Sequence, residues 1–237
     1  MALPDLLHQQ VVWRGAAPRA ATAAAVPTGF AALDRELPGG GWPTGALTEV
    51  LSRGEGIGEL QLVLPALAAL TAAGQRVAWL APPHLPYAPA LRAAGVHLEH
   101  LVVVRAPGRR DALWAAEQVL RARAFHALLA WLPRAAYPEL RRLAVGVQGG
   151  PCCALVFRPP PAASEASPAA LRLALEPAFG PGAGRLAVRI LKRRGVPLTA
   201  PLRLCIERPV LQGSHALDRA PLSPVPSPGA VARACAA

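Results

Sequence analysis

The sequence predicts an α/β fold with a mostly parallel, twisted sheet flanked by helices. Short apolar runs alternate with segments of helical spacing between Leu47 and Phe157, which is typical of strand–helix–strand units that feed a parallel sheet. The length of 237 residues suits one domain of this kind with irregular ends. Two later strand-like runs predict a hairpin at the edge of the sheet.

Each expected element has its own signal. Apolar runs predict strands at residues 47–51, 77–81, 101–105, 127–132 and 153–157, and a hairpin at 185–191 and 202–207. Residues 59–73 are apolar nearly all round and stop at Gly74, which indicates a helix lying on the sheet. Residues 111–124 and 138–147 have the spacing of amphipathic helices, the latter with Pro138 in its first turn.

Composition divides the chain into three parts. Residues 26–208 carry the periodic pattern and form the folded domain, whereas residues 1–25 are alanine-rich and 209–237 are rich in Pro and Ala with few apolar anchors. We expect both ends to be mobile, and the tail after residue 208 to be disordered. The run PPPAASEAS at 159–167 is expected to be a flexible loop.

Hydrophobic residues make up 53% of the chain, yet no membrane span is expected. The longest apolar run, 60–73, is shorter than the roughly 20 residues that a bilayer requires. It is also bounded by Glu59 and Arg76 and contains Pro65. The first 13 residues lack the unbroken apolar stretch of a signal peptide, so a cytoplasmic location without membrane contact is predicted.

Neither a metal site nor a disulfide framework is indicated. The four cysteines lack CxxC spacing, and His97, Glu99 and His100 have no third ligand nearby in sequence. We therefore expect reduced thiols and a surface turn. Aromatic burial is expected to account for four tryptophans, and a fifth, Trp13, is a candidate anchor for a partner; the four are Trp42, Trp79, Trp114 and Trp131.

The net charge of +11 favours an acidic partner, either a phosphate backbone or an acidic protein face. Lys192 is the only lysine among the 25 basic residues, a bias that GC-rich coding would also produce. Arginines at the ends of the 111–124 helix are expected to form a solvated face. Charge alone therefore leaves weak, salt-sensitive DNA binding open.

A glycine-rich loop is the most informative motif. Arg53-Gly54-Glu55-Gly56-Ile57-Gly58-Glu59-Leu60 lies between an expected strand and an expected buried helix, where a phosphate-binding P-loop belongs. A working P-loop ends in Lys followed by Ser or Thr, and here these positions hold Glu59 and Leu60. The motif is interpreted as a degenerate P-loop or a plain strand-to-helix turn, with residual nucleotide binding as the alternative.

Two segments resemble the opening of RecA-family cores. These are residues 26–34, VPTGFAALD, and 38–50, PGGGWPTGALTEV. Together with the degenerate loop and the run Leu191-Lys192-Arg193-Arg194-Gly195, they identify the chain as similar to the ImuA family of RecA-like accessory proteins of translesion DNA synthesis. The resemblance covers residues 26–207 and implies a RecA-like core.

The resemblance also implies that catalysis is lost. The aspartate that such ATPases hold near magnesium falls at Trp131, and the glutamate that activates water falls near Pro83. With the P-loop Lys and Ser/Thr also absent, no residue remains to hold magnesium or orient water. The DNA-binding loops of the family correspond to the short 133–137 and the base-poor 159–167. A protein without cofactor or enzymatic activity is expected.

Basic residues late in the chain are the expected partner-binding site. Arg189, Lys192, Arg193 and Arg194 resemble the place where RecA-family subunits present basic fingers to a neighbour's nucleotide. The hypothesis is that this side docks on the end of a RecA filament. The alternative is a solvated basic hairpin without a partner.

By resemblance, the chain is expected to be an adaptor of the mutasome, the translesion complex of the DNA-damage (SOS) response. Its expected partners are RecA, an inactive Y-family polymerase homologue and an error-prone replicative-type polymerase. Three alternatives stay open. They are a SulA-like inhibitor of cell division, an unusual nucleotide-dependent recombination ATPase, and a basic DNA-binding protein.

Overall fold

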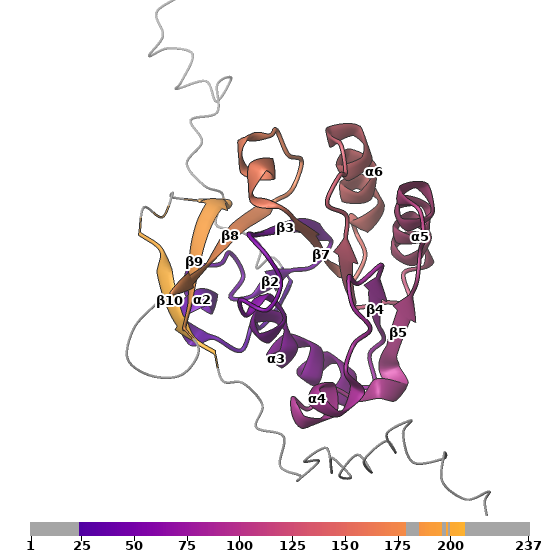
Figure 1. The fold of residues 1–237 in the computed structure, drawn as a ribbon, viewed down its shortest axis with the longest axis horizontal. Coiled ribbons are helices and arrows are strands. Elements are labelled where there is room, and N and C mark those ends of the chain that lie inside the picture. Colours follow the sequence, from indigo (N-terminus) through magenta and orange to yellow (C-terminus); the bar gives the residue numbers. More distant parts are fainter. Residues whose placement is uncertain (1–23, 179–184, 196–197, 199, 207–237) are drawn as a thin grey trace, which may run out of the picture.

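A computed structural model describes residues 24–178, 185–195, 198 and 200–206. Within them the chain forms an eight-stranded mixed sheet with helices on both faces and a small two-stranded sheet (Figure 1). The predicted α/β class with a mostly parallel sheet is confirmed. The tails predicted to be mobile, and Trp13, lie outside the described residues apart from the last two positions of the 1–25 segment.

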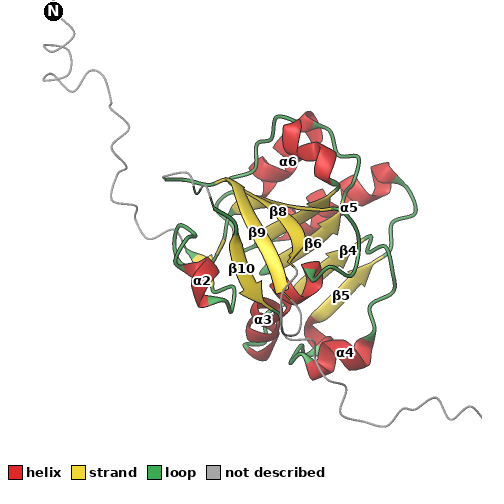
Figure 2. Ribbon diagram, turned by 60° about the vertical axis from the view of Figure 1, so that its left-hand side comes forward, coloured by secondary structure: helices red, strands yellow, loops and turns green. Residues whose placement is uncertain are grey.

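The large sheet has the strand order β10-β9-β8-β3-β7-β6-β4-β5. Strands β8, β3, β7, β6, β4 and β5 run parallel, while β9 is antiparallel to β8 and β10 to β9. Figure 2 shows β9 and β10 at one margin and β5 at the other. The strands are β3 (Ala46–Ser52), β4 (Val77–Leu80), β5 (Leu101–Val104), β6 (Ala127–Trp131), β7 (Cys153–Arg158), β8 (Leu171–Ala178), β9 (Arg185–Lys192) and β10 (Leu202–Cys205). The five predicted strands and the edge hairpin are present.

Alternate side chains of the parallel strands enter two hydrophobic cores. Trp79 of β4 faces the core under α3 (Glu59–Ala72) and α4 (Ala88–Ala93), and its neighbour Ala78 faces the core under α5 (Arg109–Ala122) and α6 (Tyr137–Val147). Burial on both faces explains why these strands are continuous apolar runs. A short 3-10 helix, η1 (Leu98–His100), leads into β5.

The first described residues close one end of the α3 core. Strands β1 (Ala25–Val26) and β2 (Trp42–Pro43) pair antiparallel and flank the short helix α2 (Ala31–Asp34). The Thr28 amide donates to Asp34 Oδ1 at 2.9 Å. Gly29 lies directly against Pro65 of α3, with a φ of +87° and no room for a β-carbon, so this turn requires glycine.

Two parts of the fold differ from the sequence prediction. Residues 171–178 form β8, a strand that was not predicted, although Leu171, Leu173 and Leu175 occupy every second position and are buried. The expected flexible loop at 159–167 instead contains a 3-10 helix, η2 (Pro160–Ser164). Prolines supply the backbone φ that a first helical turn needs, and Arg172 of β8 donates to the carbonyls of Ala162, Ala163 and Glu165 in this segment.

One tryptophan also differs from expectation. Trp42 and Trp79 are buried, but Trp114 on α5 is 65% exposed, so burial does not account for it. Trp114 lies on the outer face of an amphipathic helix whose inner face carries Leu113 and Leu120. Among the described residues, no helix has the length and apolar character that crossing a bilayer demands.

Candidate functional site

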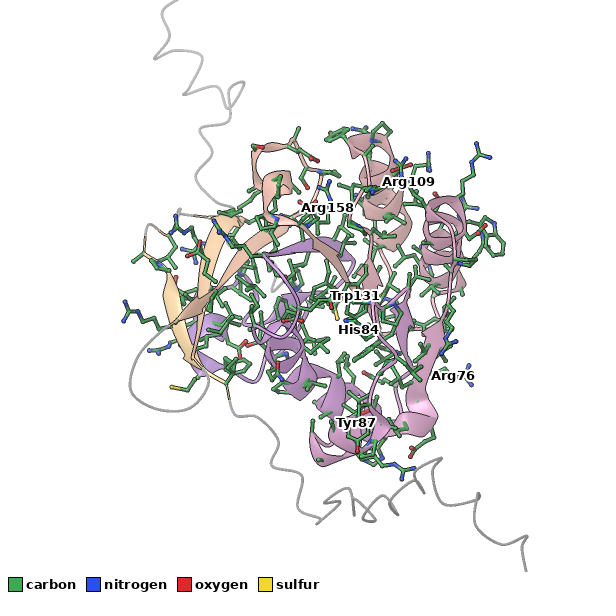
Figure 3. The ribbon with its side chains drawn as sticks, viewed as in Figure 1. Arg76, His84, Tyr87, Arg109, Trp131 and Arg158 are labelled. Carbon is green, nitrogen blue, oxygen red and sulfur yellow. The ribbon has the colours of Figure 1, made fainter. Side chains whose placement is uncertain are left out.

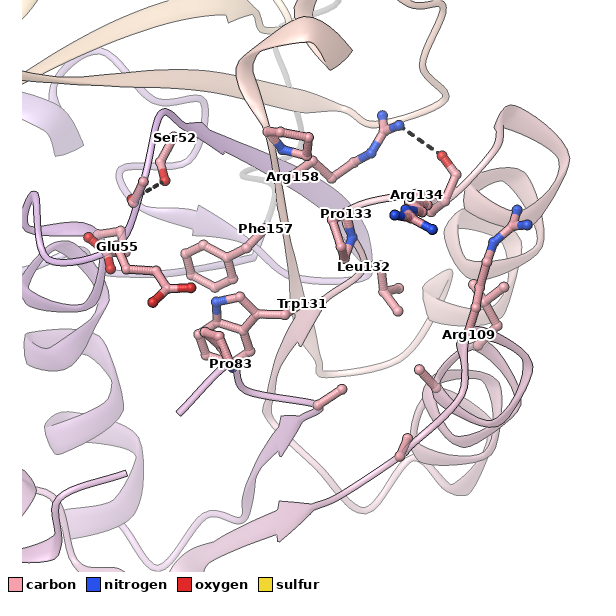
Figure 4. Close-up of a pocket in the computed structure, with 18 of the residues that line it drawn as sticks. Ser52, Glu55, Pro83, Arg109, Trp131, Leu132, Pro133, Arg134, Phe157 and Arg158 are labelled. Atoms are coloured by element: carbon pink, nitrogen blue, oxygen red, sulfur yellow. Dashed lines mark hydrogen bonds between the residues drawn. The ribbon is translucent and has the colours of Figure 1, made fainter. Parts of the chain in front are cut away.

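A cavity of about 530 Å³ opens at the carboxyl ends of the parallel strands. The loops after β3, β4, β5, β6 and β7 and the start of α5 line it (Figure 4). The chain leaves β3 and β4 toward the α3 and α4 face, but leaves β6 toward α6 on the opposite face and β7 toward η2. Such reversals between neighbouring strands are where open α/β sheets bind ligands.

The glycine-rich loop forms one wall of the cavity. Two of its backbone amides donate hydrogen bonds to the side chain of Glu59 in the same loop. Gly56 and Gly58 adopt φ values of +78° and +116°, which turn their N–H groups toward the start of α3. The Glu59 carboxylate is buried and accepts the Gly56 N–H at 2.8 Å through Oε1 and the Gly58 N–H at 3.1 Å through Oε2. Amides arranged in this way form an anion-binding nest, and here the anion is a side chain of the same loop.

Other contacts complete the loop. Ser52 Oγ donates to the Gly54 carbonyl at 2.8 Å, and the exposed Glu55 carboxylate pairs with His84 after β4. Leu60, at the position where a P-loop carries its hydroxyl, is half-buried and packs against the α3 core. Both acidic residues of the loop are therefore partnered, Glu59 within the loop and Glu55 by His84.

Aromatic rings form the floor of the cavity. The rings of Trp131 and Phe157 stack with centroids 4.7 Å apart and an interplanar angle of 12°. Trp79 meets the other side of Trp131 at 5.7 Å and 56°. Pro83 also lines the cavity, near Trp131 in Figure 4. The two positions that the resemblance assigns to an aspartate and a glutamate thus hold apolar rings.

Arginines surround the rim. Arg109 donates to Glu139 Oε2 at 2.6 Å, whereas exposed Arg53 and Arg134 have no hydrogen-bond or ion-pair partner among the described residues. In Figure 3, Arg109, Trp131 and Arg158 lie between α5 and the β8–β10 strands. The site therefore combines an apolar floor with two uncompensated positive charges.

A buried ionic cluster supports this end of the sheet. Glu49 of β3 is fully buried. Its carboxylate accepts hydrogen bonds from Arg158 Nη1 at 2.9 Å and from Arg172 Nε at 2.5 Å. Arg158 also donates to Glu165 at 2.7 Å, and Arg172 donates to the Ala162 carbonyl of η2 at 2.5 Å. The cluster ties β3, β7, β8 and η2 together. Sequence reasoning missed it, although a charged residue, Glu49, in the middle of a mostly apolar strand was a signal.

The cluster sets the ionisation of its arginine. Burial acts to lower the pKa of Arg158, but hydrogen bonds and charge attraction from Glu165 and Glu49 outweigh it and raise the pKa. Arg158 therefore stays charged. Its buried Nε has no hydrogen-bond partner among the described residues.

The expected partner-binding residues lie at the other end of the sheet and do not share one role. Arg189 on β9 and Arg194 after it are exposed. Lys192 donates to the Ser167 carbonyl at 3.0 Å, and Arg193 pairs with Glu36 Oε2 at 2.9 Å. Strands β8, β3 and β7 separate β9 from β6 and its Trp131, so the structure does not bring the basic residues to the cavity.

The candidate metal and thiol residues have ordinary surroundings. His97 Nδ1 lies 3.3 Å from Glu99 Oε1 at the surface, and no group of three potential metal ligands is present in the described part of the chain. Cys152, Cys153 and Cys205 are free thiols. Burial raises the pKa of Cys153 to about 12, so that thiol is protonated and unreactive at neutral pH.

No protein-family model matches the chain, and no curated protein matches it.

Proposed function

We propose that this chain is a non-catalytic adaptor built on a RecA-like core, serving a damage-induced complex for translesion DNA synthesis. A glycine-rich loop between the central strand β3 and helix α3 supports the RecA-like part, because phosphate-binding loops occupy this place. The sequence resemblance to the ImuA family supports the adaptor part. The observation that carries the proposal is the Glu59 carboxylate on the loop amides.

Glu59 opposes nucleotide binding in two ways. A phosphate would have to displace a carboxylate that already satisfies the Gly56 and Gly58 amides. It would then approach a buried negative charge with no P-loop lysine to compensate it, and like charges repel strongly where water is scarce. The loop keeps the shape of an anion-binding site, and its own Glu59 carboxylate occupies that site.

The rest of the cavity is unsuited to hydrolysis. Magnesium-dependent phosphoryl transfer needs a carboxylate or hydroxyl near the metal and a polar group that orients the nucleophile. Leu60, Trp131 and Pro83 stand at the positions that the resemblance assigns to these groups. None of them carries an oxygen on its side chain. Binding is therefore the proposed activity.

The proposed contact with RecA uses the edge hairpin. Of the four basic residues expected there, Arg189 and Arg194 are exposed and available to an acidic surface. Lys192 and Arg193 contact the chain itself, so their removal would also disturb the fold. A test of docking should change the first two and leave the second two intact.

A pull-down with purified RecA, with and without ATP, tests the partner. We expect the full chain to bind RecA and the variant R189E/R194E to lose at least about tenfold in affinity, or roughly 1.4 kcal/mol. The control R121E/R141E reverses two exposed arginines on α5 and α6 and should bind normally. Equal binding by both variants contradicts docking through the hairpin. Binding of a tubulin-like division protein instead would favour the SulA-like alternative.

Titration with MgATP tests the loss of the nucleotide site. We expect no heat of binding and no ATP turnover by the full chain. Saturable ATP binding or hydrolysis contradicts the proposal. Affinity for DNA that falls steeply with salt, without any protein partner, would favour a basic DNA-binding protein.

A further inference from the structure

Helices α5 and α6 lie side by side on one face of the sheet and form a strongly basic layer (Figure 1). Residues 105–142 hold eight arginines and three carboxylates, a net charge of +5 out of the +11 of the whole chain. Two of these carboxylates, Glu117 and Glu139, pair with Arg142 and Arg109. The two ion pairs join the helices but leave most of the arginine charge uncompensated.

The outward side of α5 carries a tryptophan between two arginines. Trp114 is 65% exposed, and Arg110 and Arg121, four residues before it and seven residues after it, are also exposed. Residues at these spacings lie on the same face of a helix. Ala116 and Leu120 are buried on the inner face. The two arginines and the tryptophan therefore form one stripe on the side of α5 that points away from the sheet.

The fold itself does not use these side chains. Among the described residues, neither arginine of the stripe has a hydrogen-bond or ion-pair partner, and the Trp114 ring has no aromatic or cation–π contact. On the adjacent α6, Arg141 is exposed, and Arg142 keeps 58% of its side chain exposed beside Glu117. These residues make up a surface that we call the α5–α6 face, which comprises Arg110, Trp114, Arg121, Arg141 and Arg142.

This combination of groups fits a single-stranded nucleic acid. Arginines bind phosphates and release the counterions condensed on them, and an exposed indole ring is a platform on which a base of any identity stacks. Stacking requires a base that is not already paired and stacked within a duplex. An acidic protein surface would pair with the arginines but would offer no matching group to the Trp114 ring. The ring therefore favours nucleic acid over an acidic protein.

The dimensions of the stripe suit a short length of strand. Arg110 and Arg121 are eleven residues apart, which corresponds to about 17 Å along the helix axis. A stacked strand has roughly 3.4 Å per nucleotide, so the stripe matches about five nucleotides. Trp114 lies about 6 Å from Arg110 along the same axis. One base can therefore stack on the ring while the phosphates on either side of it reach the arginines.

We propose that the α5–α6 face binds single-stranded nucleic acid, with a base on Trp114 and phosphates on the four arginines. The site differs from the one that the family resemblance implies, because the loops 133–137 and 159–167 contribute none of its residues. It goes beyond the proposed adaptor function and does not depend on which protein the adaptor binds.

Fluorescence anisotropy of the full chain with a labelled oligothymidylate of about fifteen nucleotides tests the stacking contact. Trp114→Ala should weaken binding at least about fivefold, the smallest effect expected for one stacked base, and Trp114→Phe should retain most of the affinity. Tyr87→Ala is the matched control. It removes another exposed ring, beside α4 on the opposite face of the sheet (Figure 3), and should bind normally.

Salt dependence tests the arginines. R110A/R121A should weaken binding at least tenfold at low salt. It should also reduce the slope of log affinity against log salt by about 1.4, since each phosphate contact of a single strand contributes about 0.7. The control R92A/R203A removes two exposed arginines from α4 and β10 and should change both quantities far less.

Several results would overturn the site. They are equal losses in the two double variants, an effect of Trp114→Ala no larger than that of Tyr87→Ala, and tighter binding of a duplex or of polyglutamate than of the single strand. Oligouridylate distinguishes RNA from DNA. Phosphate and ring-face contacts do not read the 2′-hydroxyl, so a preference of more than about tenfold for either strand would contradict these contacts.

The result is separable from docking on RecA. Without nucleic acid present, R110A/R121A should still bind RecA, and R189E/R194E should still bind the oligonucleotide. Failure of RecA binding with intact oligonucleotide binding would contradict the adaptor proposal alone. Failure of oligonucleotide binding with intact RecA binding would contradict the α5–α6 face alone.

Discussion

Two buried glutamates, ten residues apart in sequence, are neutralised in different ways. Glu49 meets the side chains of two arginines that come from strands far along the chain. Glu59 meets two backbone amides of its own loop. The first arrangement holds distant strands together, and the second holds a loop in the shape of an anion site. Comparable burial therefore has a global role at one glutamate and a local role at the other.

The largest effect is expected at the cluster around Glu49. Arg172→Leu leaves the fully buried Glu49 with Arg158 alone and frees the η2 carbonyls. Breaking a buried ion pair costs about 3–5 kcal/mol, and urea unfolding measures it. Arg203→Leu, on the exposed side of β10, is the matched control. A similar loss in both variants would show that the cluster has no special role.

A smaller effect is expected at Glu59. Glu59→Ala leaves the Gly56 and Gly58 amides without their acceptor. Gly56 is exposed, so water can replace its partner, whereas Gly58 is buried, and one buried donor left unsatisfied costs about 1–3 kcal/mol. Urea unfolding should show a loss within that range. The control Glu55→Ala removes an exposed ion pair with His84 and should change stability by less than about 0.5 kcal/mol. Equal losses would contradict the role of the amide contacts.

Fold and site were predictable to different degrees. The periodicity of the apolar runs was sufficient for the parallel strands, and glycine spacing was sufficient to place the loop. The turn of Glu59 back onto its own amides was not predictable, because it depends on the positive φ of Gly56 and Gly58. In the Glu49 cluster, Glu49 is separated from Arg158 by 109 positions and from Arg172 by 123 positions. Local sequence patterns carry no information on contacts of such separation. Strand β8 did have a visible alternation that was overlooked.

A third carboxylate, Glu36, pairs with one residue of the basic run 192–194 and thereby distinguishes Arg193 from its exposed neighbour Arg194. Arg193→Ala removes the ion pair with Glu36, in which both side chains are partly buried. The loss should lower the free energy of unfolding by about 1 kcal/mol. Arg194→Ala, at an exposed position, should cost nothing measurable in thermal unfolding. If R194A lost as much stability as R193A, the division of this segment into structural and available residues would be wrong.

The smallest effect is expected at Glu139, which accepts the Ala136 amide at 2.7 Å and pairs with Arg109. Burial acts to raise its pKa, but the amide and the arginine outweigh burial and lower the pKa below 4.5. The stabilisation is therefore complete above about pH 5 and is lost as the pH falls through the lowered folded-state pKa. Glu139→Gln should remove roughly 0.5–1 kcal/mol at pH 7 and progressively less as the pH is lowered below about 5. Unfolding experiments across this range measure the difference, and a loss independent of pH would contradict it.

The central place of β3 has a consequence for how the chain folds. Ala46 of β3 pairs with Cys153 of β7, and Thr48 pairs with Leu171 of β8. Both neighbours of the central strand are thus made more than 100 residues after it. Contacts of such long sequence separation slow folding. During synthesis, β3 therefore has no neighbouring strand, and the apolar helix α3 has no complete sheet to pack on, until most of the domain has left the ribosome. We expect this interval to be the period in which the nascent protein is most prone to aggregation and most dependent on chaperones.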